Sequence, residues 1–336
     1  MRNVLLVFIA LALASCSTPA EVTMMTFQGP AFGTTYNIKV FTDKEDGLEK
    51  GIDQVIYQVN KSVSTYLYES DISKINRGDS SVKVDTIFKE VFRISEMVFT
   101  SSNGYFDPTV GTLRNAYGFG EGEEKLELTP EKLDSLREFV GFRKVKILAD
   151  GTVKKEHPSI YLDFNAVAKG YGIDLLGNFL ESKNINNYII ELGGEILAKG
   201  KNITRDKLWT AGVETIDSKV ENRTFAALVE LNNQGMAGSG NYRKYRIDSL
   251  TGNKYVHTIN PLTGMAEASD VTSATVIAPT CALADAYATA FMAMGLTRSK
   301  EVISQTEGVA AYLTFIEDAN TTGIYVSQNF TDKMLK

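Results

Sequence analysis

Residues 280–295, "TCALADAYATAFMAMG", form the stretch on which the predicted fold depends. Small and apolar residues dominate it, so the stretch predicts a helix that is packed closely on most sides. Thr280 is a typical N-cap and Gly295 a typical helix stop. One acid, Asp285, interrupts the apolar run, and Thr289 follows one turn later on the same face. Asp285 is therefore either a stray polar residue on a packed helix or part of a site.

The chain on both sides of this helix shows hairpin-linked strands with helices grouped between them. This arrangement predicts an α+β fold with largely antiparallel or mixed sheets, rather than a doubly wound parallel sheet. No linker divides the chain, so we expect one compact domain. Strand patterns cover residues 33–41, 144–156 (a hairpin), 159–165, 187–200, 208–214, 225–232, 241–248, 273–279, 308–316 and 323–330. Helical patterns cover residues 48–59, 86–102, 129–141 and 166–182.

Composition and charge narrow the class of protein. The chain has 336 residues, 43% of them hydrophobic and 23% charged, which is typical of a globular protein with a sizeable core. Its net charge is −6, so neither nucleic acid nor an anionic membrane surface is expected as the main partner.

The N-terminal segment "MRNVLLVFIALALASC" predicts a secretory signal rather than part of the fold. Its apolar run is too short for a permanent membrane span, and its end resembles the lipobox of bacterial lipoproteins. We expect a signal peptide at 1–15, a lipidated Cys16 with a tether to residue 27, and a folded domain at 28–334. The protein would be anchored in the cell envelope facing the periplasm, in the inner or the outer membrane. The alternative is an ordinary signal peptide that ends near a cysteine.

Two stretches place acidic and basic residues where packing alone does not require them. In "GYFDPTVG" (104–111), Asp107 precedes a proline and is either a turn former or a functional acid. In "YLDFNAVAKGYGIDLL" (161–176), Asp163 ends a predicted strand and Asn165 can cap the following helix. Lys169 lies near the start of that helix, where an anion such as phosphate can bind; the alternative is a solvated lysine.

Two further stretches combine glycines, hydroxyls and histidine. The glycine pair of "ELGGEI" (191–196) predicts a bulge or the close approach of a ligand. His257 opens "HTINPLTG" (257–264) and is either a structural residue or a general base; for His157 we expect a structural role. The remaining cysteine, Cys281, is expected to be a small buried hydrophobe.

Several classes of catalytic site are excluded by the sequence. The chain lacks an H-E-x-x-H motif, a cysteine pair for zinc and a G-x-S-x-G nucleophile elbow. Hard-metal chemistry through carboxylate, hydroxyl and carbonyl oxygens stays open, and Asp285 and Thr289 offer such ligands.

Taken in order, these stretches resemble the ApbE family, the FAD:protein FMN transferases. The matching pieces span residues 32–290 and are "FGTTY" (32–36), "STY…SDISKIN" (64–76), "GYFDPTVG", "DFNAVAKGYGID" (163–174), "ELGGE", "GSGNY" (238–242), "HTINPLTG" and "ADAYATA" (284–290). The resemblance implies an ApbE-like (T-fold-like) catalytic domain and, since many members are envelope lipoproteins, it agrees with the N-terminal segment.

The resemblance also implies an activity. Such enzymes bind FAD as substrate, cleave its pyrophosphate with Mg²⁺, join FMN to a Thr or Ser hydroxyl of an acceptor protein and release AMP. Typical acceptors are subunits of Na⁺-pumping NADH:quinone reductase or RNF-type complexes. One alternative is an FAD pyrophosphatase, in which water replaces the hydroxyl; another is a flavin-binding lipoprotein without turnover. Tyr66 is the residue type associated with transferases.

Site residues follow from the matching motifs. FAD contacts are implied for Phe32, Tyr66, Tyr105, Phe106, Asp107, Asp163, Lys169 and Ile259. Mg²⁺ ligands are implied to be Asp285, Thr289 and the backbone carbonyl of Ala166. His257 would deprotonate the acceptor hydroxyl. The family often has Met where this chain has Phe32, so that contact would be apolar packing.

Overall fold

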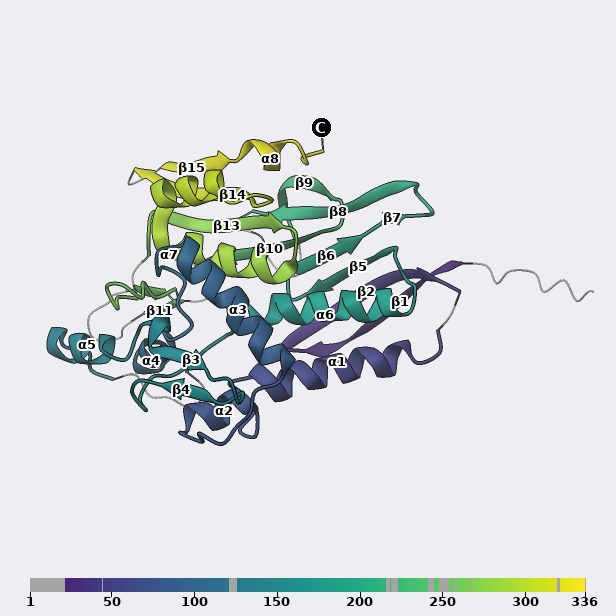
Figure 1. The fold of residues 1–336 in the computed structure, drawn as a ribbon. Helices are drawn as coiled ribbons and strands as arrows, with labels where there is room; N and C mark the ends of the chain where they lie inside the picture. The colour runs from purple at the N-terminus through teal and green to yellow at the C-terminus, as the bar shows by residue number, and fades with distance from the viewer. Residues whose placement is uncertain are drawn as a thin grey trace, which may run out of the picture.

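An eight-stranded sheet, antiparallel throughout, carries most of the fold (Figure 1). The structure is a computed structural model that describes residues 22–335 apart from 44, 121–125, 216–217, 219–222, 241–244, 248–253, 257, 267 and 319–320. In spatial order the sheet contains β1 (Thr23–Ala31), β2 (Thr34–Thr42), β5 (Tyr188–Leu192), β6 (Glu195–Lys199), β10 (Gln234–Gly240), β13 (Val271–Ala278), β14 (Ala310–Asp318) and β15 (Thr321–Val326).

Smaller sheets and eight α-helices complete the described part of the chain. The smaller sheets are β3 (Val145–Ile147) with β4 (Val153–Lys155), β11 (Tyr245–Ile247) with β12 (Lys254–Val256), and β7 (Lys201–Asn202), β8 (Lys207–Glu214) and β9 (Phe225–Leu231). The helices are α1 (Leu48–Val63), α2 (Asp71–Asn76), α3 (Thr86–Ser101), α4 (Gly111–Ala116), α5 (Pro130–Arg137), α6 (Ala168–Ser182), α7 (Cys281–Gln305) and α8 (Gln328–Thr331), with a 3₁₀ turn at Phe142–Lys144. The α+β prediction is confirmed.

Helices α1, α6 and α7 lie on one face of the main sheet (Figure 1). Ile52 of α1 and Leu176 of α6 are fully buried with Ile38 of β2, and each such side chain contributes about 1.5–3 kcal/mol through burial. Helix α3 packs on α7, where Ser101 Oγ lies 3.0 Å from the Tyr287 hydroxyl. The helix at 280–295 is therefore central, as its composition predicts.

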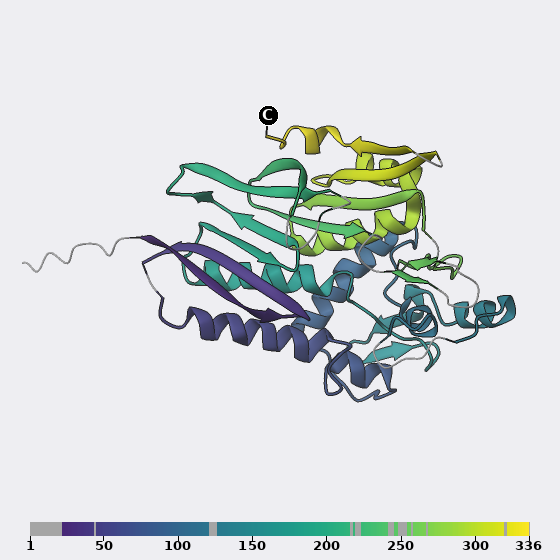
Figure 2. The same ribbon diagram turned by 180° about the vertical axis from the view of Figure 1, so that it is seen from behind.

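The opposite face of the main sheet is covered by the β7–β8–β9 sheet. Trp209 and Val229 of the smaller sheet share a core with Met236 of β10, Ile277 of β13 and Phe330 of α8. The short elements α2, α4, α5 and β3–β4 gather beyond one end of the main sheet, as the views in Figures 1 and 2 agree. The described chain thus has a sheet-and-helix body and a group of short elements beside it.

Helix α7 begins and breaks at the predicted residues but continues beyond them. The Thr280 hydroxyl accepts a hydrogen bond of 3.3 Å from Leu283 N, so Thr280 is the N-cap. Gly295 has φ 76° and ψ 174°, which interrupts the helical conformation. A second helical segment then runs to Gln305, because the Asp270 carboxylate accepts from Leu296 N at 2.9 Å and caps this new start.

The start of α7 approaches two other backbones closely. A Cβ added at Gly170 of α6 would lie 2.5 Å from the Cys281 carbonyl oxygen, and one added at Gly235 of β10 would lie 2.4 Å from Cys281 N. Both contacts are made with main-chain atoms, which cannot rotate away as a side chain can. Glycine is therefore required at both positions for α7 to sit where it does.

Three sequence predictions are corrected by the structure. Residues 159–165 form no strand beyond an isolated bridge at Tyr161, because the Asn76 amide binds both Leu162 N and Leu162 O at 2.8 Å and takes the place of a ladder. The glycine pair is not a bulge: Gly193 and Gly194 have φ 61° and 105° and form the turn between β5 and β6.

The third correction concerns the predicted tether. Strand β1 starts at Thr23 and pairs with β2 along its whole length, so residues 23–27 belong to the sheet rather than to a tether ending at residue 27. Cys16 and the predicted signal peptide lie outside the described residues. Within residues 22–335 as described, no helix is both long and apolar enough to cross a membrane.

Replacing Gly235 with Ala should destabilise the fold, because the new methyl group would press on the α7 backbone. We expect a loss of about 1–3 kcal/mol in the free energy of unfolding, measured by urea denaturation. Gly238→Ala in the same strand is the matched control, since its Cβ would meet nothing closer than Thr275 Oγ1 at 3.9 Å. Equal stability of the two variants would contradict the close-approach interpretation.

Candidate active site

A buried cluster of charged side chains lies where α6 begins beside the first turns of α7. Asp285 is 6% exposed, and its Oδ2 accepts a hydrogen bond of 3.1 Å from the Gly170 N–H. Glu195, the first residue of β6, is 5% exposed, and its Oε1 lies 2.5 Å from Lys169 Nζ. Three elements that are distant in sequence thus bring two carboxylates and one ammonium group together.

This cluster holds one more negative than positive charge when all three groups are ionised. Burial raises the pKa of Asp285 and that of Glu195, and Lys169 opposes both shifts. Burial alone would lower the pKa of Lys169, but the charges of Glu195 and Asp285 outweigh it and raise that pKa. Glu195 Oε2 is buried without a hydrogen-bond partner. A bound cation would balance the excess negative charge.

Asp174 fixes the position of the α7 N-terminus beside this cluster. Its carboxylate, on α6, accepts hydrogen bonds from Cys281 N at 2.7 Å and Ala282 N at 2.9 Å. Burial raises the pKa of Asp174 to about 7, although both backbone hydrogen bonds oppose that shift. Cys281 is fully buried and burial raises the pKa of its thiol, as expected for a small hydrophobe.

The residues that would supply oxygen ligands to Mg²⁺ lie near the N-terminal ends of α6 and α7. Thr289 is half-buried one turn after Asp285, and Ala166 is half-buried just before α6. The Gly170 N–H donates to Asp285, whereas a regular helix would direct it to the Ala166 carbonyl. In the part of the chain that the structure describes, no three His, Cys, Asp or Glu side chains form a metal-binding group. One carboxylate, one hydroxyl and one carbonyl fit a hard cation that keeps waters and substrate phosphates as ligands.

Asp163 and Asn165 hold the loop before α6. Asp163 is 7% exposed, its Oδ2 lies 3.1 Å from Arg114 Nη1, and its Oδ1 accepts from Asn165 N at 2.8 Å. The predicted cap at Asn165 is wrong, because α6 starts only at Ala168 after Val167. The Asn165 side chain instead donates to Thr65 Oγ1 at 3.3 Å and connects this loop to the segment before Tyr66.

Tyr105, Phe106 and Asp107 are consecutive predicted FAD contacts, but they differ in exposure. Phe106 is 4% exposed within the main core. Asp107 is 6% exposed; its Oδ1 accepts from Thr109 N and Oγ1 at 2.8 and 2.6 Å, and its Oδ2 accepts from Phe142 N at 3.0 Å. Burial raises the pKa of Asp107 despite these bonds. Both carboxylate oxygens of Asp107 are thus occupied by hydrogen bonds within the protein. Of these three residues, only Tyr105 is partly exposed.

The other predicted contacts are spread around the site. Phe32 lies in the β1–β2 turn, and its ring packs against Gly172 of α6, in agreement with an apolar packing role. Ile259 is 6% exposed and packs in a small core with Leu113 of α4. Tyr66 is 55% exposed. His257 lies outside the described residues.

Sequence reasoning assigned no role to Glu195, Asp174 or Arg114. Glu195 and Asp174 stand inside quoted motifs, and an acid that directly precedes the apolar run Ile196–Ala198 is the one signal that marks Glu195. Nothing local marks Asp174 as the partner of residues 281–282, or Arg114 as the partner of Asp163.

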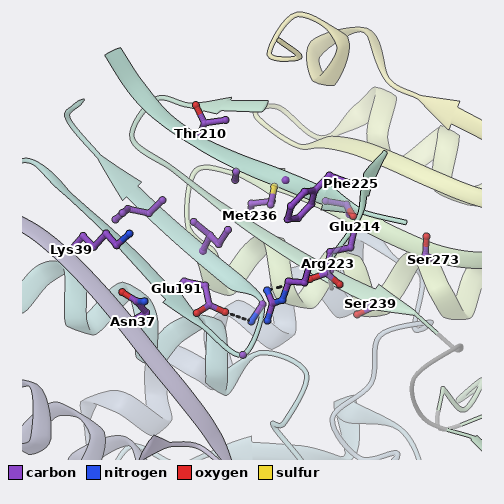
Figure 3. Close-up of a pocket in the computed structure, with 18 residues that line it drawn as sticks. Asn37, Lys39, Glu191, Thr210, Glu214, Arg223, Phe225, Met236, Ser239 and Ser273 are labelled. Carbon is purple, nitrogen blue, oxygen red and sulfur yellow. Dashed lines mark hydrogen bonds and ion pairs between the residues drawn. The ribbon is translucent and has the colours of Figure 1, made fainter. Parts of the chain in front are cut away.

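A cavity of about 400 Å³ lies on the sheet face opposite α6 and α7, between the main sheet and the β8–β9 hairpin (Figure 3). Asn37, Glu191 and Ser239 line it, with Phe225 and Met236, and Asn37 Oδ1 is buried without a hydrogen-bond partner. None of the predicted site residues lines this cavity. The cavity and the charged cluster are therefore separate features.

Comparison with known proteins gives concordant matches. Residues 32–313 match the ApbE family. The FAD:protein FMN transferase of Haemophilus influenzae is 33% identical over 93% of this chain and 92% of that protein, and the one of Vibrio cholerae is 35% identical over 90% of each. Among solved structures, the flavin transferase ApbE from Vibrio cholerae superposes with a TM-score of 0.80 at 30% identity, covering 93% of this chain and 99% of that one. The apo flavinyl transferase ApbE of Pseudomonas stutzeri gives a TM-score of 0.81 at 25% identity, covering 93% and 97%.

The excess negative charge of the cluster predicts that removing its lysine costs more stability than neutralising one of its carboxylates. Lys169→Met would leave two carboxylates without their cation, so we expect a loss of about 3–5 kcal/mol in unfolding free energy without added metal. Glu195→Gln should cost clearly less, because Lys169 then still faces Asp285. Both values would come from urea denaturation in the presence of a chelator.

The partly exposed pair Lys199–Glu181 provides the control for that comparison. Its atoms lie 2.7 Å apart on partly exposed side chains, so Lys199→Met should cost at most about 1 kcal/mol. A Glu195→Gln variant as unstable as Lys169→Met would contradict an excess of negative charge in the cluster.

Proposed function

The chain belongs to the ApbE family, and on that premise we propose that it transfers FMN from FAD to a protein. Its relatives over nearly the whole chain are named FAD:protein FMN transferases. The observation that supports this activity most directly is the buried cluster at the start of α6 and α7. Asp285 and Lys169 within it are the residues that the family motifs assign to metal and phosphate binding.

FAD would bind with its pyrophosphate at the start of α6. Lys169 would place its ammonium beside a phosphate oxygen, although its present partner is Glu195. The amide groups at the N-terminus of α6 add a partial positive charge in the same direction. Tyr66 is 55% exposed and Tyr105 is partly exposed, so both aromatic rings are available to the flavin part of the substrate.

Asp285, Thr289 and the Ala166 carbonyl would hold Mg²⁺ at this position. When bound, Mg²⁺ would neutralise phosphate charge and stabilise the charge that develops on the leaving AMP. The fit rests on the excess negative charge of the cluster, on the burial of Asp285 and on the unpartnered Glu195 Oε2.

The transfer itself needs a base and a leaving group. His257 would take the proton of the acceptor Thr or Ser hydroxyl, since such a hydroxyl is a poor nucleophile at neutral pH. The hydroxyl oxygen would then form a bond to the FMN phosphorus while the bond from that phosphorus to the AMP oxygen breaks. The products are AMP and a protein that carries FMN through a phosphoester bond.

We propose the cellular location and the acceptor proteins from the sequence alone. A lipidated Cys16 would anchor the domain in the envelope with the active site facing the periplasm. Acceptors would be flavinylated subunits of NADH:quinone reductase or RNF-type complexes, as the family resemblance implies. The rival activity is FAD pyrophosphatase, which would use the same cluster with water in place of the hydroxyl.

Intact-mass measurement distinguishes these two activities. The domain would be incubated with FAD, Mg²⁺ and a candidate acceptor peptide that contains a threonine. We expect the peptide to gain the mass of one FMN unit and AMP to appear in equal amount. Free FMN and AMP without a modified peptide would support the pyrophosphatase instead.

The two histidines of the chain provide the variant and its control for the same assay. His257→Ala should lower the transfer rate by about 10²- to 10⁴-fold, the usual contribution of a general base, while FAD still binds. The His157 ring stacks on Phe139 with ring centroids 4.4 Å apart, in agreement with a structural role. His157→Ala should therefore transfer FMN at the normal rate. Full activity in His257→Ala would contradict its role as base.

Dependence of the rate on Mg²⁺ tests the assigned ligands. Asp285→Asn should lower the transfer rate on the order of 100-fold or more, since loss of metal stabilisation costs several kcal/mol. Thr289→Val should raise the Mg²⁺ concentration needed for half-maximal rate, whereas Thr289→Ser keeps the hydroxyl and should behave normally. An unchanged Mg²⁺ response in Asp285→Asn would refute its ligand role.

A further inference from the structure

Arg114 of α4 contacts two of the predicted FAD-binding residues, Asp163 and Tyr66. Its Nη1 lies 3.1 Å from Asp163 Oδ2, and its Nη2 donates a hydrogen bond of 3.2 Å to the Tyr66 hydroxyl. The planar guanidinium can make both contacts at once because its donors point in fixed directions. The Arg114 side chain is 21% exposed, so this bridge lies at the boundary between the interior and solvent.

The Asp163 end of this bridge is rigid. Asp163 is 7% exposed, its N–H donates to the Pro108 carbonyl at 2.7 Å, and its second carboxylate oxygen accepts from Asn165 N. Asn165 in turn binds Thr65 Oγ1 and directly precedes Ala166. Arg114 is therefore attached to the same loop that presents the proposed metal-binding carbonyl.

Without Arg114, the Tyr66 side chain would lose its hydrogen bond to the rest of the described protein. The ring is 55% exposed, and among the described residues the Tyr66 hydroxyl has no other hydrogen-bond partner. The backbone of Tyr66 is held separately, through a bond of 3.3 Å from its N–H to Ser64 Oγ. An exposed aromatic side chain with one polar contact loses most of its orientation when that contact is removed.

We propose that Arg114 is a positioning residue for FAD binding, which holds the exposed Tyr66 ring in place by anchoring it to the buried Asp163. This role rests on the proposed function, in which Tyr66 contacts FAD. Because Asp163 neutralises the guanidinium, the effect acts through the orientation of Tyr66 before FAD arrives and reduces the entropy lost on binding. Affinity for FAD should depend on Arg114, while the chemical step should not.

The neighbouring pair Arg77 and Tyr68 supplies a matched control in the same loop. Arg77 lies over the Tyr68 ring at 3.6 Å and donates to the Tyr68 carbonyl at 2.7 Å. Tyr68 is even more exposed than Tyr66, at 70%. An arginine thus also contacts an exposed tyrosine two residues away, through the ring and the backbone carbonyl rather than the hydroxyl, and neither residue is among the predicted FAD contacts.

Titration of the protein with FAD, followed by flavin fluorescence in Mg²⁺ and without acceptor, tests this role. Arg114→Met should raise the Kd for FAD about 3- to 10-fold, the equivalent of one lost hydrogen bond. Tyr66→Phe removes only the hydroxyl and should have a similar effect, and the double variant should be no worse than Arg114→Met alone. In transfer assays KM for FAD should rise while kcat stays within about 2-fold. Arg77→Met should bind FAD as the unaltered chain does.

The possible results separate this role from the proposed function. Unchanged affinity in Arg114→Met, additive effects in the double variant, or an equal loss in Arg77→Met would overturn the positioning role alone. If the unaltered chain does not bind FAD, the proposed function fails and this role fails with it. Thermal unfolding of each variant shows whether a loss of affinity reflects a loss of fold, and Tyr66→Phe, on a largely exposed ring, keeps the test decisive if Arg114→Met is unstable.

Discussion

The contact between the backbone at the start of α7 and its neighbours in α6 and β10 determines the geometry of the candidate site. Gly170 and Gly235 leave no room for a side chain there, so main-chain atoms of three elements meet directly. Asp174 then holds the free N–H groups of Cys281 and Ala282. Interiors packed at this density transmit small displacements, so a shift of this contact would also move the residues that follow in each element.

That contact explains why the charged groups are so deeply buried. The Gly170 N–H reaches Asp285 because α6 and α7 touch at this point, and Lys169 then pairs with Glu195 at the start of β6. Burying two carboxylates with one lysine costs stability, since the excess charge is removed from water. The same low dielectric strengthens attraction to an incoming cation. The cluster therefore costs stability in the free protein and favours a cation when one is present.

Local sequence patterns predicted the features that depend on local interactions. The helix at 280–295 and its cap at Thr280 follow from periodicity and capping preferences, and the predicted stop at Gly295 is an interruption after which the helix resumes. Features that depend on distant partners were missed or wrong. The strand at 159–165 fails because Asn76, more than 80 residues earlier, binds Leu162, and Asn165 does not cap because Asp163 and Thr65 bind it. A sequence motif also does not predict the direction of a side chain: Asp107 lies in a matching motif, but its carboxylate bonds to Thr109 and Phe142 inside the protein.

The two activities considered for this family would use the buried half of the site in the same way. In the proposed function, Asp285, Lys169 and Glu195 would act on phosphate and metal charge, and that charge would be the same whether water or a protein hydroxyl attacks. Selection of the acceptor must therefore come from residues that an acceptor can reach. Tyr66 is the most exposed of the predicted contacts within the described residues, and Arg114 links it to the buried part of the site. On the proposed function, discrimination between transfer and hydrolysis would therefore depend on the exposed residues around the site rather than on the buried charged cluster.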